Sequence, residues 1–463
     1  MNPEFQRNLW LEYSYRRAVF MAVSLGLIFL LGNSTFGTFA LRTSAEYAFY
    51  AIAVIWGARN AAQAVVGEIQ DRTWDGQRLS SLSPFAMTWG KLLGATSHAW
   101  VGGLLCILVL VWTAFRQGGA VAAMGDLSYY LMIGLMAQSV ALFASLLAVR
   151  RRQTHSRLDV FFYQIAGLIA AWGVWWAWQV VSAGGVFGGA FEFDELRWWG
   201  MSIDASRFYL VSLLIFLFWA FIGCLRLMRL ELSMQNTPIV WSVFVAFMVF
   251  YFAGQQGPEN LARFGIEVPA VVLPLLFACI TAAGLTYVAV FAEPKDLVLY
   301  RWLAKSFKAR NIYAFWSRLQ GWMIAYVATL ILGVALALTL ATNPPEILGF
   351  EFLGVSAIIS ALGLLTRDIA IFLFFPLLSG SKRGEAPAII TLVMLYNVAP
   401  QLAGTTGVGV FFYPFGGDLG LMGPLIAWGE AALMWFVLYR VAGKNLLPNG
   451  AENIPVNAQP ERK

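Results

Sequence analysis

Residues 67–95 read GEIQDRTWDGQRLSSLSPFAMTWGKLLGA, the longest charged and turn-rich interval in the first third of the chain. One hydrophobic run ends just before it at Val66, and another begins at Leu92. Its charged residues are Glu68, Asp71, Arg72, Asp75, Arg78 and Lys91. A polar segment between two apolar runs predicts a short helix, a turn and the entry to a membrane span, all at the cytoplasmic surface. An ordinary solvated loop is the alternative interpretation.

The composition indicates a membrane protein. Of 463 residues, 59% are hydrophobic and only 12% are charged, whereas soluble domains carry about 25% charged residues. The net charge of +6 follows from the loops between spans, and no nucleic-acid partner is expected. Cys106, Cys224 and Cys279 all lie in apolar runs, so no disulfide framework is expected.

Apolar runs long enough to cross about 30 Å of hydrocarbon predict an all-α polytopic protein with about twelve transmembrane helices. The predicted spans are 18–40, 47–66, 92–115, 128–149, 160–182, 206–225, 238–254, 268–292, 321–342, 352–378, 387–404 and 419–440. Lys and Arg gather in the alternate loops, and the opposite side holds only Arg42, Arg116, Arg197, Arg207 and Arg263. This asymmetry places the N-terminus and the C-terminus in the cytoplasm.

The chain divides into two predicted halves of six spans each. Residues 18–230 form the first half with the loop 67–91, and residues 231–443 form the second with the cytoplasmic loop 293–320. Trp89-Gly-Lys-Leu-Leu-Gly94 and Trp316-Ser-Arg-Leu-Gln-Gly321 share a Trp-x-basic-Leu-x-Gly pattern at the same place in each half. Parallel repeats are a common transporter plan. Residues 1–17 are an expected interfacial amphipathic helix, and residues 444–463 an expected polar, disordered tail.

No set of residues has the spacing of catalytic machinery or of a metal site, and no G-x-x-x-x-G-K-[ST] phosphate-binding loop occurs. Neither an enzyme activity nor a bound metal is therefore expected in this chain. Ionisable residues inside predicted spans are functional candidates, because a buried unpaired charge is costly. The candidates are Arg59, Arg367, Asp368 and Glu430. Structural ion pairs are the alternative to a direct role for them with substrate or protons.

The stretch 67–95 resembles the corresponding segment of the permease subunits of type-2 ABC exporters. The resemblance rests on Glu68 at the end of a span, Arg72-Thr73-Trp74-Asp75, Leu82-Ser83-Pro84 and Gly90-Lys91-Leu92. In that family this segment is a coupling helix, which docks into a groove on a separate nucleotide-binding subunit. Residues 2–17 are similar to the family's connecting helix.

The resemblance implies a permease that couples ATP hydrolysis in a partner ATPase, in two copies, to export across a bacterial inner membrane. ATP and Mg would belong to the partner, and this chain would hold no cofactor. The coupling residues would be Glu68, Asp71, Arg72, Thr73, Trp74, Asp75 and Arg78, with Glu293, Asp296, Arg301 and Trp302 in the second loop. Phe- and Trp-rich spans with few buried charges favour a hydrophobic or lipid-like cargo.

The main alternative is a secondary carrier of the major facilitator type. Gly67-Glu-Ile-Gln-Asp71-Arg72 matches the G-x-x-x-D-R opening of its signature loop, but Trp74-Asp75-Gly76 replaces the basic continuation. A membrane-embedded enzyme is a third class. It would need an Asp-rich or His-rich cytoplasmic motif, and the sequence shows none.

Overall fold

The computed structural model describes residues 2–150, 157–182, 195–234, 236–254, 269–293, 295, 297–342, 354–378, 385–404 and 420–446. Within these ranges, seven helical segments are long and apolar enough to cross a membrane. They are Tyr15–Ser34, Ser97–Val149, Ala205–Glu231, Val272–Ala292, Gly321–Thr342, Val355–Leu377 and Met422–Val441. The polytopic membrane class is therefore confirmed. The count of twelve spans and the orientation of the termini remain predictions.

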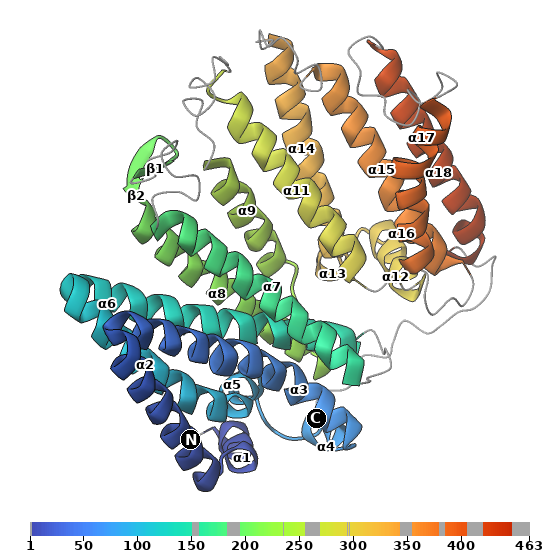
Figure 1. The fold of residues 1–463 in the computed structure, drawn as a ribbon. Helices are drawn as coiled ribbons and strands as arrows, with labels where there is room; N and C mark the ends of the chain where they lie inside the picture. The colour runs from blue at the N-terminus through green and yellow to red at the C-terminus, as the bar shows by residue number, and fades with distance from the viewer. Residues whose placement is uncertain are drawn as a thin grey trace. The chain divides into compact units, whose positions relative to one another are not determined.

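The chain separates into two compact units. The first comprises Met1–Leu196 and Ser202–Asn236, and the second comprises Arg197–Met201 and Thr237–Lys463. Figure 1 labels the helices and strands of both units.

The first unit contains α1 (Pro3–Glu12), α2 (Tyr15–Phe49), a π-helical segment η1 (Tyr50–Trp56) and α3 (Gly57–Gln70). It continues with α4 (Trp74–Arg78), α5 (Pro84–Ala95), α6 (Ser97–Arg150), α7 (Arg157–Ser182) and α8 (Ala205–Glu231). Its core lies where the alanine-rich face of α3 meets α6 and α7. Ala58, Ala61 and Ala62 are fully buried there, so small side chains bring these helices close together.

Two glycines turn long helical runs back on themselves. The 54 residues of α6 would extend about 80 Å as one straight helix, far more than a bilayer core. Gly119, near the centre of α6, has φ 72°, and Gly37 in α2 has φ 71°; glycine adopts this left-handed region without steric cost. The first turn therefore lies at Gly37 and not in the predicted loop 41–46.

An ion pair joins the helical segments that follow these two turns. The Arg42 guanidinium lies 2.7 Å from a carboxylate oxygen of Asp126, and the Tyr50 and Tyr129 hydroxyls are 2.9 Å apart. Arg42 was expected in an outward loop. The structure places it on α2, where it connects α2 to α6.

The second unit contains α9 (Ile239–Gly254), α11 (Val272–Ala292), α12 (Leu297–Lys308), α13 (Ile312–Ser317) and α14 (Gly321–Thr342). It continues with α15 (Val355–Leu377), α16 (Glu385–Val393), η3 (Met394–Val398), α17 (Ala399–Gly404) and α18 (Met422–Leu446). Helix α15 is the most enclosed of these, packed between α14 and α18 (Figure 1). Of the predicted tail 444–463, residues 444–446 belong to α18, and residues 447–463 lie outside the described residues.

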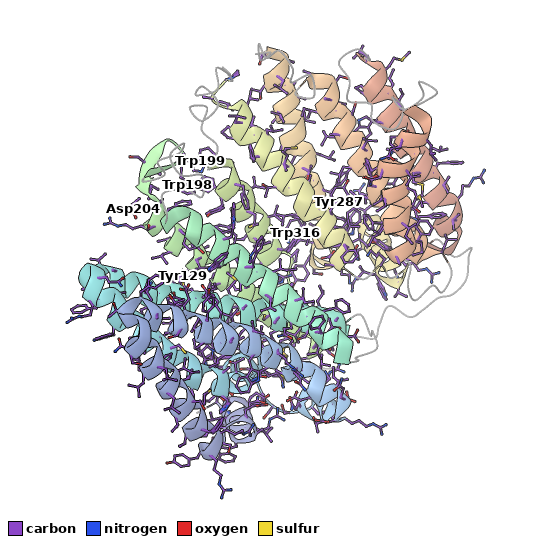
Figure 2. All side chains as sticks on the ribbon, viewed as in Figure 1. Tyr129, Trp198, Trp199, Asp204, Tyr287 and Trp316 are labelled. Atoms are coloured by element: carbon purple, nitrogen blue, oxygen red, sulfur yellow. The ribbon has the colours of Figure 1, made fainter. Side chains whose placement is uncertain are left out.

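Within the described residues, one β-hairpin interrupts the all-helical fold, formed by β1 (Glu195–Trp198) and β2 (Met201–Asp204). Its turn places Trp199 and Gly200 at positive φ, 50° and 77°. The Trp199 amide donates to the Gly254 carbonyl at 2.8 Å, and its ring stacks on Phe250 with centroids 5.1 Å apart. Figure 2 labels Trp198 and Trp199 beside α9.

Candidate functional site

The predicted coupling segment is a folded element with defined turns. After α3 ends at Gln70, Arg72 adopts a left-handed conformation with φ 58°. The Thr73 amide then reaches back to the Glu68 carbonyl at 2.9 Å, the hydrogen bond that closes a helix C-terminus. Further along, the Ser83 hydroxyl accepts from the Ala86 amide at 3.2 Å, and Pro84 is the first residue of α5. The expected short helix is α4, and the Ser-Pro pair starts α5.

A partly buried set of charges joins α1, α3 and α5. We call Glu4, Arg7, Glu68 and Lys91 the amino-terminal charge cluster. The Lys91 ammonium and the Arg7 guanidinium each lie 2.9 Å from a Glu4 oxygen, and the same two groups pair with the two oxygens of Glu68. Two cations face two carboxylates, so the cluster is electrically balanced. Lys91 is fully buried, and such burial is tolerated only for a well-paired charge.

Helix α1 reaches α5 because two glycines leave room for it. A Cβ at Gly90 would lie 2.7 Å from the Glu4 side chain, and one at Gly94 would lie 2.7 Å from Asn8 Cβ. The Asn2 side chain adds a hydrogen bond to the Ala86 carbonyl at 2.6 Å. The predicted amphipathic segment 1–17 is therefore a helix only at Pro3–Glu12, with α2 beginning at Tyr15.

The electrostatics of Glu4 favour its charged form. Burial alone would raise the pKa of the Glu4 carboxyl. The nearby charge of Lys91, its hydrogen bond, the charge of Arg7 and the hydrogen bond from Asn8 outweigh that effect. The pKa of Glu4 therefore lies below its ordinary value, and the carboxylate stays ionised at neutral pH.

The structure divides the predicted coupling residues of the first loop into an inner and an outer set. Trp74 is 5% exposed, and the Lys91 ammonium lies 5.2 Å from the centre of its ring. Glu68 also points inward, into the amino-terminal charge cluster. Trp74, one of the predicted coupling residues, therefore belongs to the core of the first unit and not to its exposed surface. The exposed residues are Asp71, Arg72, Thr73, Asp75 and Arg78.

The outer face of α4 carries a shallow pocket. Asp75, Arg78, Leu79, Leu232 and Ser233 line it. Arg78 lies 3.7 Å from Asp75 and donates to the carbonyl of Glu231 at 2.9 Å, which connects α4 to the end of α8. This face combines both charge signs with the exposed Leu79 side chain.

In the second predicted loop, residues 293–320, the predicted coupling residues make different contacts from those of the first loop. Glu293 accepts a hydrogen bond from the Gly321 amide at 2.9 Å, which joins the end of α11 to the start of α14. The Trp302 ring lies under the Arg318 guanidinium, 5.0 Å from its centre. Arg301 is exposed, and Asp296 lies outside the described residues. Glu293 and Trp302 thus both contact other residues of the second unit.

The intramembrane candidates of the second unit form one network. Asp368 accepts from Arg367 at 2.9 and 3.0 Å through one oxygen, and from Tyr287 and Tyr396 at 2.7 and 2.6 Å through the other. The Nη1 atom of Arg367 lies 2.6 Å from a carboxylate oxygen of Glu430. The network ties α15 to α11, η3 and α18; Figure 2 labels Tyr287 on α11. The Arg367 guanidinium pairs with the carboxylates of Asp368 and Glu430, as in a structural ion pair.

Arg59, the other intramembrane candidate, lies exposed on α3. Sequence reasoning missed five members of these two networks: Glu4, Arg7, Lys91, Tyr287 and Tyr396. The sequence did contain a signal for these networks, because Glu68 and Asp368 are carboxylates in or beside apolar runs and each needs a partner for its charge. Nothing in the local sequence indicates which distant helix supplies them.

No protein-family model matches this chain, and searches of curated proteins and of solved structures also return no match. In the part of the chain that the structure describes, no group of three His, Cys, Asp or Glu residues is placed to hold a metal ion.

Proposed function

We propose that this chain is the permease subunit of an ATP-binding-cassette exporter and that a separate ATPase docks on the outer face of α4. The observation that carries the proposal is the amino-terminal charge cluster. It fixes α1, α3 and α5 to one another, and Lys91 also contacts Gln77 of α4 at 2.9 Å. A displacement of α4 would therefore be transmitted to α3 and α5 through these contacts.

The chemistry of the exposed residues suits a protein partner. Asp71, Arg72 and Asp75 offer charge-assisted hydrogen bonds, and Leu79 offers an apolar contact between them. Arg72 holds a left-handed conformation that costs a non-glycine residue about 1 kcal/mol or more. Glycine would fill that turn more easily, so the side chain itself is a candidate for function.

The partner would bind ATP and Mg, and the complex would act in a bacterial inner membrane. We infer a hydrophobic or lipid-like cargo, because the buried charges Arg367 and Asp368 are already paired with each other and with Glu430. Two copies of the ATPase are expected from the two halves of the chain. The mass of the intact complex tests that number.

The first experiment is purification of the tagged chain in mild detergent, with identification of co-purifying proteins and an ATPase assay. A stoichiometric partner with nucleotide-binding motifs is expected. A chain that purifies alone, stable and without ATPase activity, would contradict the proposal and favour the secondary carrier.

The docking face is tested with matched charge reversals. Arg72→Glu combined with Asp75→Arg should abolish co-purification of the ATPase, whereas Arg116→Glu, also at an exposed arginine, should leave it intact. Trp74→Ala is a poor test, because the ring is buried and its removal would disturb folding. Unchanged binding by the Arg72/Asp75 variant would show that the partner docks elsewhere.

A further inference from the structure

The hairpin formed by α12 and α13 has a one-sided charge. From Leu297 to Gln320 the chain has five basic residues and no acidic residue. The basic residues are Arg301, Lys305, Lys308, Arg310 and Arg318. The first loop, residues 67–91, has three of each sign. The two loops therefore present different chemistry, although the sequence places them at equivalent positions.

The hairpin has a defined structure. Arg318 donates to the Ser306 hydroxyl at 3.2 Å, and the Phe307 and Phe315 rings lie 5.7 Å apart. Arg310 turns the chain with φ 51°, and the Asn311 amide reaches back to the Ser306 carbonyl at 3.1 Å. These contacts hold α12 against α13, so the surface is preformed.

Large apolar side chains are exposed at the turn of this hairpin. Phe307 is 71% exposed, Ile312 80% and Tyr313 86%. Lys305, Lys308 and Arg310 are exposed beside them. Leu303 and Ser306, on the side of α12 away from Lys305 and Lys308, are buried, so the basic side chains lie on the outer side of the helix. Phe307 follows Leu303 by one turn on the same side, but it lies near the end of α12 and is exposed.

Both ends of the hairpin are fixed to candidate membrane spans. Glu293, directly after α11, accepts the Gly321 amide at the start of α14, and both of these helices are long and apolar enough to cross a bilayer. The hairpin therefore begins and ends at one membrane face, within reach of its headgroups.

We propose that α12–α13 lies in the headgroup layer of an anionic bilayer, with Phe307, Ile312 and Tyr313 inserted and the basic side chains on lipid phosphates. Basic amphipathic helices with aromatic residues bind in this way. The absence of acidic residues from 297–320 separates it from the mixed-sign face of α4. The proposal does not depend on the assignment of the chain as an exporter subunit.

The test is amide hydrogen exchange on the full-length chain in two nanodiscs, one of phosphatidylcholine alone and one containing phosphatidylglycerol as well. Each basic group near an anionic surface strengthens binding about fivefold. With two groups in contact, exchange across 297–318 should slow at least about tenfold in the anionic bilayer. Peptides from 67–91 in the same samples are the internal control and should exchange equally in both.

A neutralised variant and added salt sharpen the test. Lys305→Gln with Lys308→Gln and Arg310→Gln should remove the difference between bilayers, while α11 and α14 keep their protection and so report correct folding. If that variant does not fold, high salt applied to the unmodified chain should remove the difference, because it screens exposed charges. Equal exchange of 297–318 in both bilayers would overturn the proposal. Protection that appears only when an ATPase partner is added would also overturn it, and would assign the hairpin to protein docking.

Discussion

Replacing Lys91 with Met should release α1 from α5. The Lys91 ammonium is fully buried and contacts Glu4, Glu68 and Gln77. Met retains most of the side-chain volume but removes the charge, which leaves two carboxylates to share Arg7. Breaking a buried ion pair by removing one partner costs about 3–5 kcal/mol.

The expected effect on dynamics follows from this value. A tenfold change in an equilibrium corresponds to about 1.4 kcal/mol, so amides of α1 should exchange at least about a hundredfold faster. Hydrogen exchange with mass spectrometry on the detergent-purified protein measures this change. Peptides of α15 should be unaffected, because that helix belongs to the other unit.

Two further variants isolate the cause. Lys308→Met makes the same substitution at an exposed site and should change stability by no more than about 0.5 kcal/mol. Glu4→Gln combined with Lys91→Met leaves one cation, Arg7, opposite one carboxylate, Glu68, and should restore part of the protection. Wild-type exchange in Lys91→Met alone would refute the assignment of the cluster as the joint between α1 and α5.

Three other outcomes are expected. Because the pKa of Glu4 is below its ordinary value of 4.5, its contribution to α1 docking is fully present above that pH and is lost as the pH falls through the lowered value. Exchange in α1 should therefore be flat from pH 5 to 8, after correction for intrinsic rates, and accelerate only in stronger acid; acceleration near pH 6 would contradict this. Arg72→Gly relieves the backbone strain of the left-handed conformation and should raise the free energy of unfolding by about 1 kcal/mol, measured by thermal unfolding. The same variant should weaken docking of the ATPase. A loss of stability would show that the arginine side chain supports the fold. Tyr287→Phe and Tyr396→Phe each remove a hydrogen bond to the Asp368 carboxylate and should destabilise the protein by about 1.5–3 kcal/mol, whereas the exposed Tyr439→Phe should have little effect. Equal stability of all three variants would argue against the network.

Local features of the structure followed closely from the sequence. The interval 67–95 was predicted to hold a turn before the next span, and α5 begins after that turn at Pro84. The polar interval between two apolar runs became α4 with its turns. These outcomes depend on backbone preferences and on hydrogen bonds between near neighbours, and such interactions are visible in a short window of sequence.

The direction in which each side chain points was harder to predict from the sequence. Trp74 was predicted among the coupling residues but its ring is buried beside Lys91, and Arg42 was expected in a loop but pairs with Asp126 on α6. Hydropathy reports the average environment of a segment. It does not report which face of a five-residue helix meets a distant side chain.

The sequence by itself determined that this is a helical membrane protein, because apolar runs of span length have no other stable arrangement than helices in a bilayer. It also located the charged interval 67–95 and the intramembrane charges of α15. Only the tertiary structure decided which charges are partners: Glu68 with Lys91 and Arg7, and Arg367 with Glu430. The physical reason is that the bilayer enforces burial locally, residue by residue along a helix, whereas neutralising a buried charge requires a partner supplied by the packing of distant helices.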